Sequence, residues 1–160
     1  MGVEIVELCE LDVAELCRLN NEFAAETSLV NEDEMGRLVG MAFYARGMAG
    51  PDAFLIAFDE KAEYANANFA FFSERWRKFV YIDRVITAGH AMRRGLARAL
   101  YEDLFLRAVA MGHTVVGCEV NLMPANPGSD AFHARMGFAE VGSAQLANGK
   151  TVRYLERRLV

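Results

Sequence analysis

The fold of this chain is decided by one stretch, Val85-Ile86-Thr87-Ala88-Gly89-His90-Ala91-Met92-Arg93-Arg94-Gly95-Leu96-Ala97-Arg98. In it a β-branched strand ends, a short loop turns, and a helix begins among arginines and small residues. A helix N-terminus leaves backbone N–H groups unpaired, and these donors and the helix dipole attract anions. Gly95 and Ala97 are small enough for a phosphate to approach the backbone. We therefore predict a phosphate-binding junction, with charge-assisted contacts from three arginines, Arg93, Arg94 and Arg98.

Two better-known phosphate motifs are excluded at this junction. No Gly-Lys-Ser/Thr follows, so it is not a nucleotide P-loop, and the three-glycine dinucleotide pattern is missing. The alternative to a binding site is an ordinary strand-to-helix connection with surface arginines. The stretch alone leaves both interpretations open.

The residues on either side predict a right-handed β-α-β unit. A strand is expected over Phe79–Thr87, and a long helix over Ala91–Met111, whose apolar residues recur every four positions until Gly112 ends it. A second strand follows over Thr114–Val120. A crossover of this kind joins two parallel strands, and these occupy the middle of the predicted sheet.

The remaining elements predict an α/β domain that spans residues 1–160. The order expected from periodicity and turn residues is strand, two helices, two strands, a loop with a short helix, then the β-α-β unit, a helix and a hairpin. The expected ranges outside the unit are Val3–Cys9, a helix capped by Asp12, a helix from Asn31 to about Gly40, Met41–Met48, Ala53–Phe58, the loop Asp59–Phe79, Ser129–Met136, Gly137–Ala144 and Lys150–Leu159.

Composition excludes several classes of function. The chain has 160 residues, of which 53% are hydrophobic, and a net charge of −5, which argues against a general nucleic-acid binder. No CxxC pair exists among the three cysteines, so a structural zinc site is not expected. No apolar run is long enough to cross a membrane. Unpaired cysteines without a secretory signal predict a cytoplasmic protein.

Two separate motifs in the chain resemble the acetyl-CoA-binding core of the GNAT N-acetyltransferases. The first is the strand Tyr81–Thr87 with the turn Arg93–Ala97, and the second is the run Asn126–Phe138. The family pattern at the turn, Arg/Gln-x-x-Gly-x-Gly/Ala, is matched at its two small positions, but its first position is Met92. In the second motif, His133 stands where the family has Tyr. The two motifs lie about 30 residues apart, as in the family, and the match covers residues 79–140.

The resemblance implies a fold and a cofactor. The fold is a single-domain, mixed and mostly antiparallel sheet with a central parallel β-α-β unit and helices on both faces. The co-substrate is acetyl-CoA, and no metal is expected. Its pantetheine arm would lie along the strand edge, and its pyrophosphate would sit on the turn. The residues implied are Val85, Ile86, Thr87, Met92, Arg93, Arg94, Gly95, Leu96, Ala97, Arg98, Asn126, Ser129, Phe132 and His133.

The resemblance also implies direct acetyl transfer to a primary amine of a small molecule, a peptide or a protein. The thiolate that leaves needs a general acid, and His133 occupies the family's position for it; alternatively, His133 merely packs on its helix. The attacking amine must be neutral, and the candidate bases are Asp83 and Glu119. Alternation places Asp83 on the face of its strand that also carries Tyr81, Val85 and Thr87. Asp83 and Arg84 could instead form a structural salt bridge.

Other interpretations of the chain differ in class. Met92 and the missing tyrosine favour a non-catalytic acyl-CoA-binding or sensor module, and a purely structural α/β subunit is the third. The acceptor pocket could be lined by residues 20–23 and 64–76. The acids that would suit a cationic amine are equally explained as solvated surface groups: Glu22, Glu26, Glu60 and Glu63. The exposed hairpins and the aromatic segment could form a homodimer contact.

Overall fold

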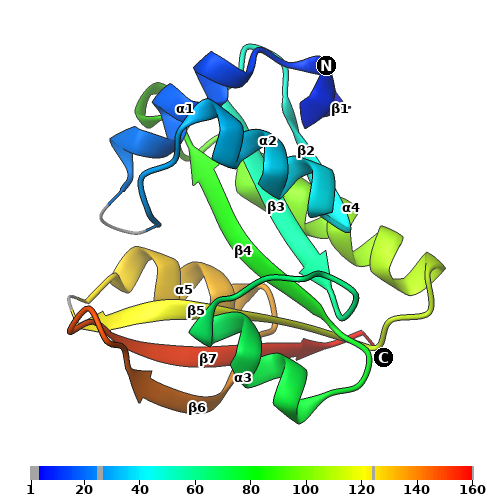
Figure 1. The fold of residues 1–160 in the computed structure, drawn as a ribbon, viewed down its shortest axis with the longest axis vertical. Coiled ribbons are helices and arrows are strands. Elements are labelled where there is room, and N and C mark those ends of the chain that lie inside the picture. Colours follow the sequence, from blue (N-terminus) through cyan, green and yellow to red (C-terminus); the bar gives the residue numbers. More distant parts are fainter. Residues whose placement is uncertain (1–3, 25–26, 124, 160) are drawn as a thin grey trace.

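A computed structural model describes residues 4–24, 27–123 and 125–159 as a seven-stranded sheet with helices on both faces (Figure 1). The strand order is β1-β2-β3-β4-β5-β7-β6, and β4 and β5 form the parallel pair. The strands are β1 Ile5–Glu7, β2 Tyr44–Met48, β3 Ala53–Asp59, β4 Val80–Thr87, β5 Val115–Met123, β6 Ala139–Gln145 and β7 Thr151–Arg158. The helices are α1 Val13–Glu22, α2 Glu32–Met41, α3 Ala67–Arg75, α4 Leu96–Ala110 and α5 Pro127–Arg135.

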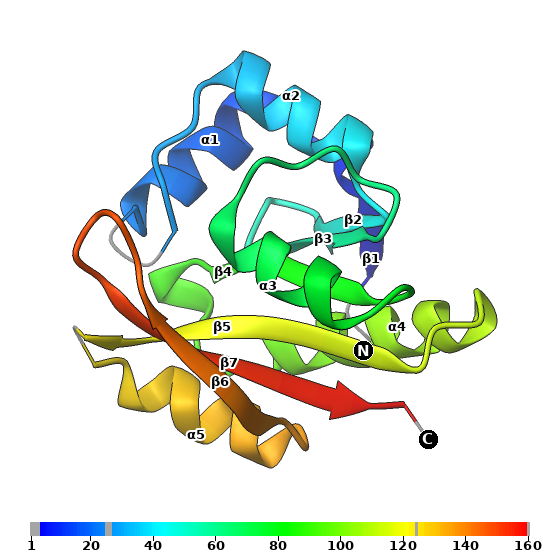
Figure 2. The ribbon, with the colours of Figure 1, turned by 60° about the horizontal axis from the view of Figure 1, so that its bottom comes forward.

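The helices form two layers around the sheet. Helices α1, α2 and α3 lie on one face, and α4 and α5 lie on the other (Figures 1 and 2). Helix α4 contacts β2, β3 and β4, while α3 contacts β4 and β5. The predicted fold class is confirmed, including the β-α-β unit in which α4 joins the parallel strands β4 and β5.

Short polar side chains fix where several helices begin. Asp12 caps α1, Asn31 caps α2, Asn66 caps α3 and Asn126 caps α5, each by accepting a backbone N–H of the first turn. Each cap satisfies donors that the helix leaves unpaired. In contrast, the N-cap position of α4 is Gly95, which provides no side-chain cap. The exception lies at the predicted phosphate-binding junction.

The structure corrects the predicted start of α4. The sequence pattern predicts a helix from Ala91, but α4 begins at Leu96 after a single 3-10 turn over Gly89–Ala91. Arg93 has φ 66° and Gly95 has φ 76°, which a right-handed helix cannot contain. The chain therefore makes a loop over these residues before the helix starts.

Other predicted bounds shift at the ends of the elements. The first strand is limited to β1, because a 3-10 turn over Leu8–Glu10 follows it, and Val3 lies outside the described residues. Strand β5 runs three residues beyond the predicted end at Val120. The short helix predicted within 59–79 is α3, and the C-terminal hairpin is β6 and β7.

A bulge in β4 interrupts the alternation of its side chains. Ile56 pairs with Arg84 and Ala57 pairs with Ile82, so Asp83 is an extra residue on β4. An extra residue resets which face the following side chains take and bends the strand. The single face predicted for Tyr81, Asp83, Val85 and Thr87 is therefore wrong beyond the bulge.

The parallel pair at the centre of the sheet is short. Within the described part of the chain, β4 and β5 pair only at Val80 with Val116 and at Tyr81 with Gly117. At that point Phe72 of α3 presses on β5: a Cβ on Gly117 would lie 2.4 Å from the ring. Beyond it the two strands part, and each has one edge free of the other.

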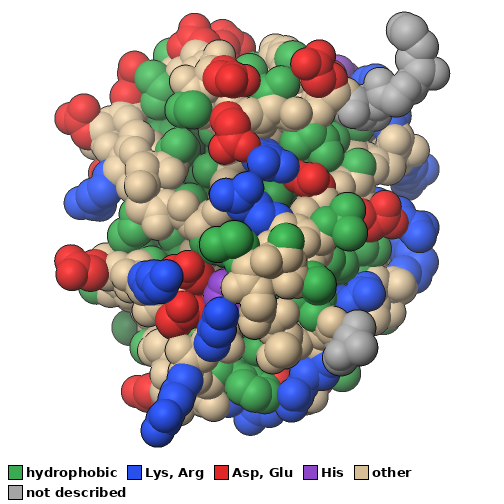
Figure 3. Space-filling model, turned by 90° about the vertical axis from the view of Figure 1, so that its right-hand side faces the viewer, with side chains coloured by type: hydrophobic (Ala, Val, Ile, Leu, Met, Phe, Trp, Pro, Cys, Tyr) green, Lys and Arg blue, Asp and Glu red, His purple; other side chains and the backbone are tan. Residues whose placement is uncertain are grey.

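The surface mixes the two signs of charge. On the face shown in Figure 3, most acidic side chains lie toward the top and basic ones are more numerous toward the bottom, with hydrophobic ones between them. No described helix combines the length and the hydropathy of a membrane span.

Candidate functional site

A cavity of about 970 Å³ opens where β4 and β5 part. Its walls come from both strands, the start of α4, helix α5, the segment before and at the start of α3, and the β6–β7 turn. This volume lies in the range of small-molecule sites, ~300–1,000 Å³. The lining includes every predicted cofactor residue except Arg94, whose side chain is exposed.

Unpaired backbone donors lie at one end of the cavity. Helix α4 begins there without a side-chain cap, so the N–H groups of its first turn face the cavity wall formed by Gly95, Leu96 and Ala97. Arg93 and Arg98 also line this end. Donors, small side chains and cations meet in one place, which is the arrangement that a diphosphate requires.

The free edge of β4 forms one wall. The other edge of this strand is bonded to β3 as far as the pair Ala53 and Thr87. Val85, Ile86 and Thr87 line the cavity and lie beyond the last pair with β5. An extended, amide-bearing ligand can bond to such an edge as an added strand would.

His133 lies in the cavity wall with both ring nitrogens engaged. Its Nδ1 is 2.8 Å from the Ser129 carbonyl oxygen, which can only accept, so Nδ1 carries the proton. The Nε2 then accepts the hydroxyl hydrogen of Tyr101, at 2.8 Å. Burial lowers the pKa of His133, which favours the neutral ring. The charged imidazole required for a general acid is thus the disfavoured form.

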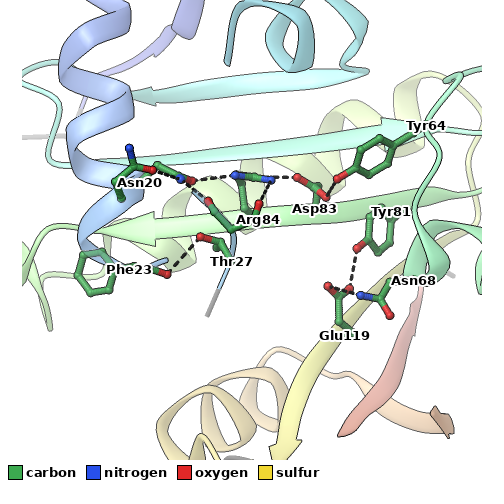
Figure 4. A network of polar contacts seen from close by, with 11 residues as sticks. Asn20, Phe23, Thr27, Tyr64, Asn68, Tyr81, Asp83, Arg84 and Glu119 are labelled. Atoms are coloured by element: carbon green, nitrogen blue, oxygen red, sulfur yellow. Dashed lines mark hydrogen bonds and ion pairs between the residues drawn. The ribbon is translucent and has the colours of Figure 1, made fainter. Parts of the chain in front are cut away.

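Glu119 projects from β5 into the same cavity and is held by two donors. The Tyr81 hydroxyl donates to Oε2 at 2.7 Å, and the Asn68 amide donates to Oε1 at 3.2 Å (Figure 4). Burial raises the pKa of Glu119 to about 8, and the two hydrogen bonds act in the opposite direction. The carboxyl therefore titrates in the range in which a general base for an amine works.

Asp83, the other predicted base, is held in an ion pair and a hydrogen bond. The Tyr64 hydroxyl donates to Oδ1 at 2.7 Å, and Arg84 Nε donates to Oδ2 at 2.7 Å (Figure 4). Both members of this ion pair have buried side chains. The structure thus shows the salt bridge that was the alternative to a catalytic role.

Arg84 extends this network to the opposite wall. Its Nη1 donates to Asn20 Oδ1 at 2.9 Å, and its Nη2 lies 3.4 Å from Ser28 Oγ. Asn20 in turn donates to the Ser28 carbonyl at 2.7 Å. The connection between α1 and α2, which carries the cavity-lining Phe23, Thr27 and Ser28, is therefore fastened to β4.

The residues predicted for the acceptor side divide in two. Phe23, Tyr64, Asn66 and Asn68 line the cavity, whereas the aromatic residues of α3 pack into the core: Phe69, Phe71 and Phe72. The acids Glu22, Glu60 and Glu63 do not line it, and Glu26 lies outside the described residues.

Sequence reasoning missed the partners of the predicted site residues. Tyr81 and Asn68 hold Glu119, Tyr101 holds His133, and Tyr154 donates to Asn68 Oδ1 at 2.9 Å. Each comes from a different element, so no local spacing marks it. The one available signal was the buried polar residues that interrupt apolar segments, because such groups need partners.

A group of potential metal ligands lies outside this cavity. Atoms of Asp59, Glu60 and His113 lie within 4.8 Å of one another. Burial lowers the pKa of His113; the charges of Glu60 and Asp59 oppose that shift, and those of Lys78 and Lys61 add to it. The expected absence of a metal stays a prediction.

Comparison with solved structures identifies the same fold in known proteins. The ribosomal-protein-S18-alanine N-acetyltransferase of Escherichia coli is 16% identical, with a TM-score of 0.74 over 99% of this chain and 94% of that chain. Ard1 of Thermoplasma volcanium is 15% identical, with a TM-score of 0.76 over 100% and 99%. The putative acetyltransferase yncA of Salmonella typhimurium, solved with acetyl-CoA, is 14% identical, with a TM-score of 0.72 over 100% and 95%.

At these identities the structural likeness shows the fold alone. A search of curated proteins found no significant match. The sequence itself, however, matches the family model described as "Acetyltransferase (GNAT) family" over residues 6–138, which includes both predicted motifs and all of the cavity lining except the residues of the β6–β7 hairpin. This chain therefore belongs to the GNAT family of acetyltransferases.

Proposed function

We propose that this acetyltransferase transfers an acetyl group from acetyl-CoA directly to a primary amine of a small molecule, a peptide or a protein. One observation carries the proposal. The cavity joins an uncapped helix start, a free strand edge and a buried carboxyl with a pKa of about 8. A diphosphate, an amide-bearing arm and a reacting amine need these three features respectively.

Glu119 is the group that we assign to the attacking amine. Acetyl-CoA supplies the activated acetyl group when bound. The amine nitrogen forms the new C–N bond, the C–S bond breaks, and the nitrogen loses a proton that Glu119 accepts. General-base catalysis of this kind contributes ~10²–10⁴-fold. Asp83 is not assigned a proton transfer, because its carboxylate forms a buried ion pair with Arg84, whereas the donors to Glu119 are neutral.

The pair of His133 and Tyr101 is the group that we assign to the departing sulfur. The neutral imidazole holds the Tyr101 hydroxyl at the cavity wall. If the Tyr101 hydroxyl turns away from His133 Nε2, its hydrogen can be donated to the thiolate, which otherwise leaves with its charge unshielded. A backbone N–H from the free edge of β4 supplies the corresponding donor to the carbonyl oxygen.

The proposal is tested by thiol release from acetyl-CoA with the full chain and a library of amines and short peptides. We expect release with a subset of acceptors, and a fall of at least ~100-fold in Glu119→Gln with the same acceptor. Ser73→Ala, on the exposed side of α3, is the matched control. Binding of CoA without thiol release for any acceptor would reject the enzymatic function.

A specific observation favours a second function, a non-catalytic acyl-CoA-binding module. His133 is buried and neutral where the family has a tyrosine, and Met92 replaces the cation of the turn. Under this alternative, CoA raises the melting temperature of the protein, and no acceptor in the library is acetylated. A ligand at 100 times its Kd adds ~2.7 kcal/mol of stability.

A further inference from the structure

A buried chain of hydrogen bonds runs through Glu119 and joins four elements. The Tyr154 hydroxyl of β7 donates to Asn68 Oδ1 at 2.9 Å, and Asn68 Nδ2 of α3 donates to Glu119 Oε1 at 3.2 Å. On the other side, the Tyr81 hydroxyl of β4 donates to Oε2. Figure 4 shows the Asn68 amide and the Tyr81 hydroxyl approaching the carboxyl from different sides.

Asn68 is an unusual residue for its position. It is the second residue of α3, only 8% exposed, and its helical neighbours Phe69 and Phe72 belong to the core. Asparagine is a weak helix former, and a buried amide without partners costs free energy. The cap of α3 is supplied by Asn66, so the Asn68 side chain is not needed to begin the helix.

Tyr154 decides which way the Asn68 amide faces. A tyrosine hydroxyl that donates to Oδ1 leaves the NH₂ group on the opposite side, directed at Glu119. Tyr154 is itself fixed, because its ring stacks on Phe71 with centroids 3.9 Å apart and it is 2% exposed. The packing of Tyr154 against Phe71 therefore fixes the orientation of the Asn68 amide that donates to Glu119.

A donor at this position acts on one protonation state of the carboxyl. A hydrogen bond from a neutral amide stabilises the carboxylate more than the carboxylic acid, so it opposes the effect of burial. Without Asn68, burial would keep Glu119 protonated at a higher pH, and fewer molecules would hold a carboxylate ready to accept a proton.

We propose that Asn68, oriented by Tyr154, is a positioning residue that directs the Glu119 carboxyl and stabilises its ionised form. The inference rests on the proposed function in so far as Glu119 is the base. Neither Asn68 nor Tyr154 needs to touch the acceptor for this role.

The test follows the titration of Glu119 in the full chain, with no acceptor present. Carboxyl ¹³C shifts of glutamate-labelled protein are recorded against pH, and Glu119→Gln identifies the signal. We expect Asn68→Ala to raise the midpoint; a rise of one unit cuts the ionised fraction well below the midpoint ~10-fold. Tyr154→Phe should shift it in the same direction by less, and Ser73→Ala should leave it in place.

The kinetic readout uses an acceptor found in the library. In Asn68→Ala, the acid limb of the kcat/KM profile should move to higher pH, and high pH should restore part of the lost rate. A merely structural role would lower the rate at every pH.

Failure of the inference is distinguishable from failure of the proposed function. A Glu119 midpoint unchanged in both Asn68→Ala and Tyr154→Phe overturns the inference, whatever the turnover. If Asn68→Ala does not fold, Tyr154→Phe alone decides, since it keeps the ring and removes only the hydroxyl. Full turnover in Glu119→Gln rejects the base, while a shifted midpoint still supports the coupling.

Discussion

The Tyr81 hydroxyl of β4 donates a 2.7 Å hydrogen bond to Glu119 of β5, and the backbone of Tyr81 forms the last pair of these strands with Gly117, two residues before Glu119. A side-chain hydrogen bond thus connects the two strands where their backbone pairing has ended. Of the two residues, Glu119 lines the cavity, and the Tyr81 hydroxyl holds this candidate base from behind.

Glu119 should make the stability of the fold fall as pH rises. In the unfolded chain a glutamate ionises near pH ~4.3, but in the fold the pKa is raised to about 8. Its stabilising contribution is present below pH ~4.3 and is lost as pH rises through 8. Glu119→Gln stays neutral, and the Tyr81 hydroxyl can accept from its amide. We expect the variant to melt higher than the wild type at pH 8, by ~2–4 °C per kcal/mol regained. An equal gain at pH 5 would contradict this cause.

Arg84 should be among the most costly side chains to truncate. Arg84→Met leaves the Asp83 carboxylate buried without its cation, which costs ~3–5 kcal/mol in denaturant unfolding. Adding Asp83→Asn should recover part of the loss, because the uncompensated charge is gone. The control is Arg98→Met, from an exposed pair with Glu102, which should cost less than ~0.5 kcal/mol. Equal losses for the two arginines would show that burial of the pair is not the cause.

His133→Phe should separate binding from turnover. The variant keeps an aromatic ring on α5 but removes the partner of the Tyr101 hydroxyl. We expect CoA affinity to change little in a thermal-shift titration and thiol release to fall ~10-fold or more. Unchanged thiol release would remove His133 from the reaction.

The same substitution has a pH signature. Because the folded-state pKa of His133 is lowered by burial, wild-type stability is lost as pH falls through the unfolded value, ~6.5. His133→Phe should flatten that part of the curve of melting temperature against pH. A curve as steep as that of the wild type would assign the acid sensitivity to other groups.

The three arginines of the α4 junction should not be equivalent. Arg98 lines the cavity and Arg94 does not. Arg98→Ala should weaken CoA binding about tenfold, in line with ~1.5–3 kcal/mol for a hydrogen bond from a charged group. Arg94→Ala should change it less than about twofold, and added salt should narrow the difference. Isothermal titration with CoA measures the Kd of both variants. An equal loss of affinity in Arg94→Ala and Arg98→Ala would show that the arginines act through their overall charge and not through a specific contact.

Gly117 should not tolerate a methyl group. A Cβ there would lie 2.4 Å from the Phe72 ring, which is 1% exposed and cannot withdraw into solvent. We expect Gly117→Ala to destabilise the fold by ~1–3 kcal/mol, and Phe72→Leu to relieve part of that cost. Gly36→Ala, in α2 with open space around it, should instead stabilise by ~0.5–1 kcal/mol. The denaturant midpoints of the two variants measure this difference. Similar midpoint shifts in Gly117→Ala and Gly36→Ala would show that the clash with Phe72 is not the cause.

The order of elements could be predicted because periodicity and turn residues are local signals. The Arg93–Ala97 turn and the Asn126–Phe138 run likewise carried the family resemblance within short segments. The bulge at Asp83 could not be predicted, because it appears only in the register between β3 and β4. Glu119 and Asp83 looked equally suited to act as the base in sequence. In the structure, Arg84 and Tyr64 bind the Asp83 carboxylate, and the contact with Arg84 is an ion pair. Glu119 receives hydrogen bonds only from the neutral side chains of Tyr81 and Asn68.

The parting of β4 and β5 has a consequence for amide protection. The middle of a sheet usually holds the most slowly exchanging hydrogens, yet in the described part of this chain the backbone pairing of β4 with β5 stops at Tyr81 and Gly117. A ligand that forms hydrogen bonds with the backbone of β4 there would take the place of a neighbouring strand. Deuterium uptake around Val85–Thr87 should therefore be fast without CoA and slow with it, because the bound substrate would supply the missing hydrogen-bond partners at the centre of the sheet.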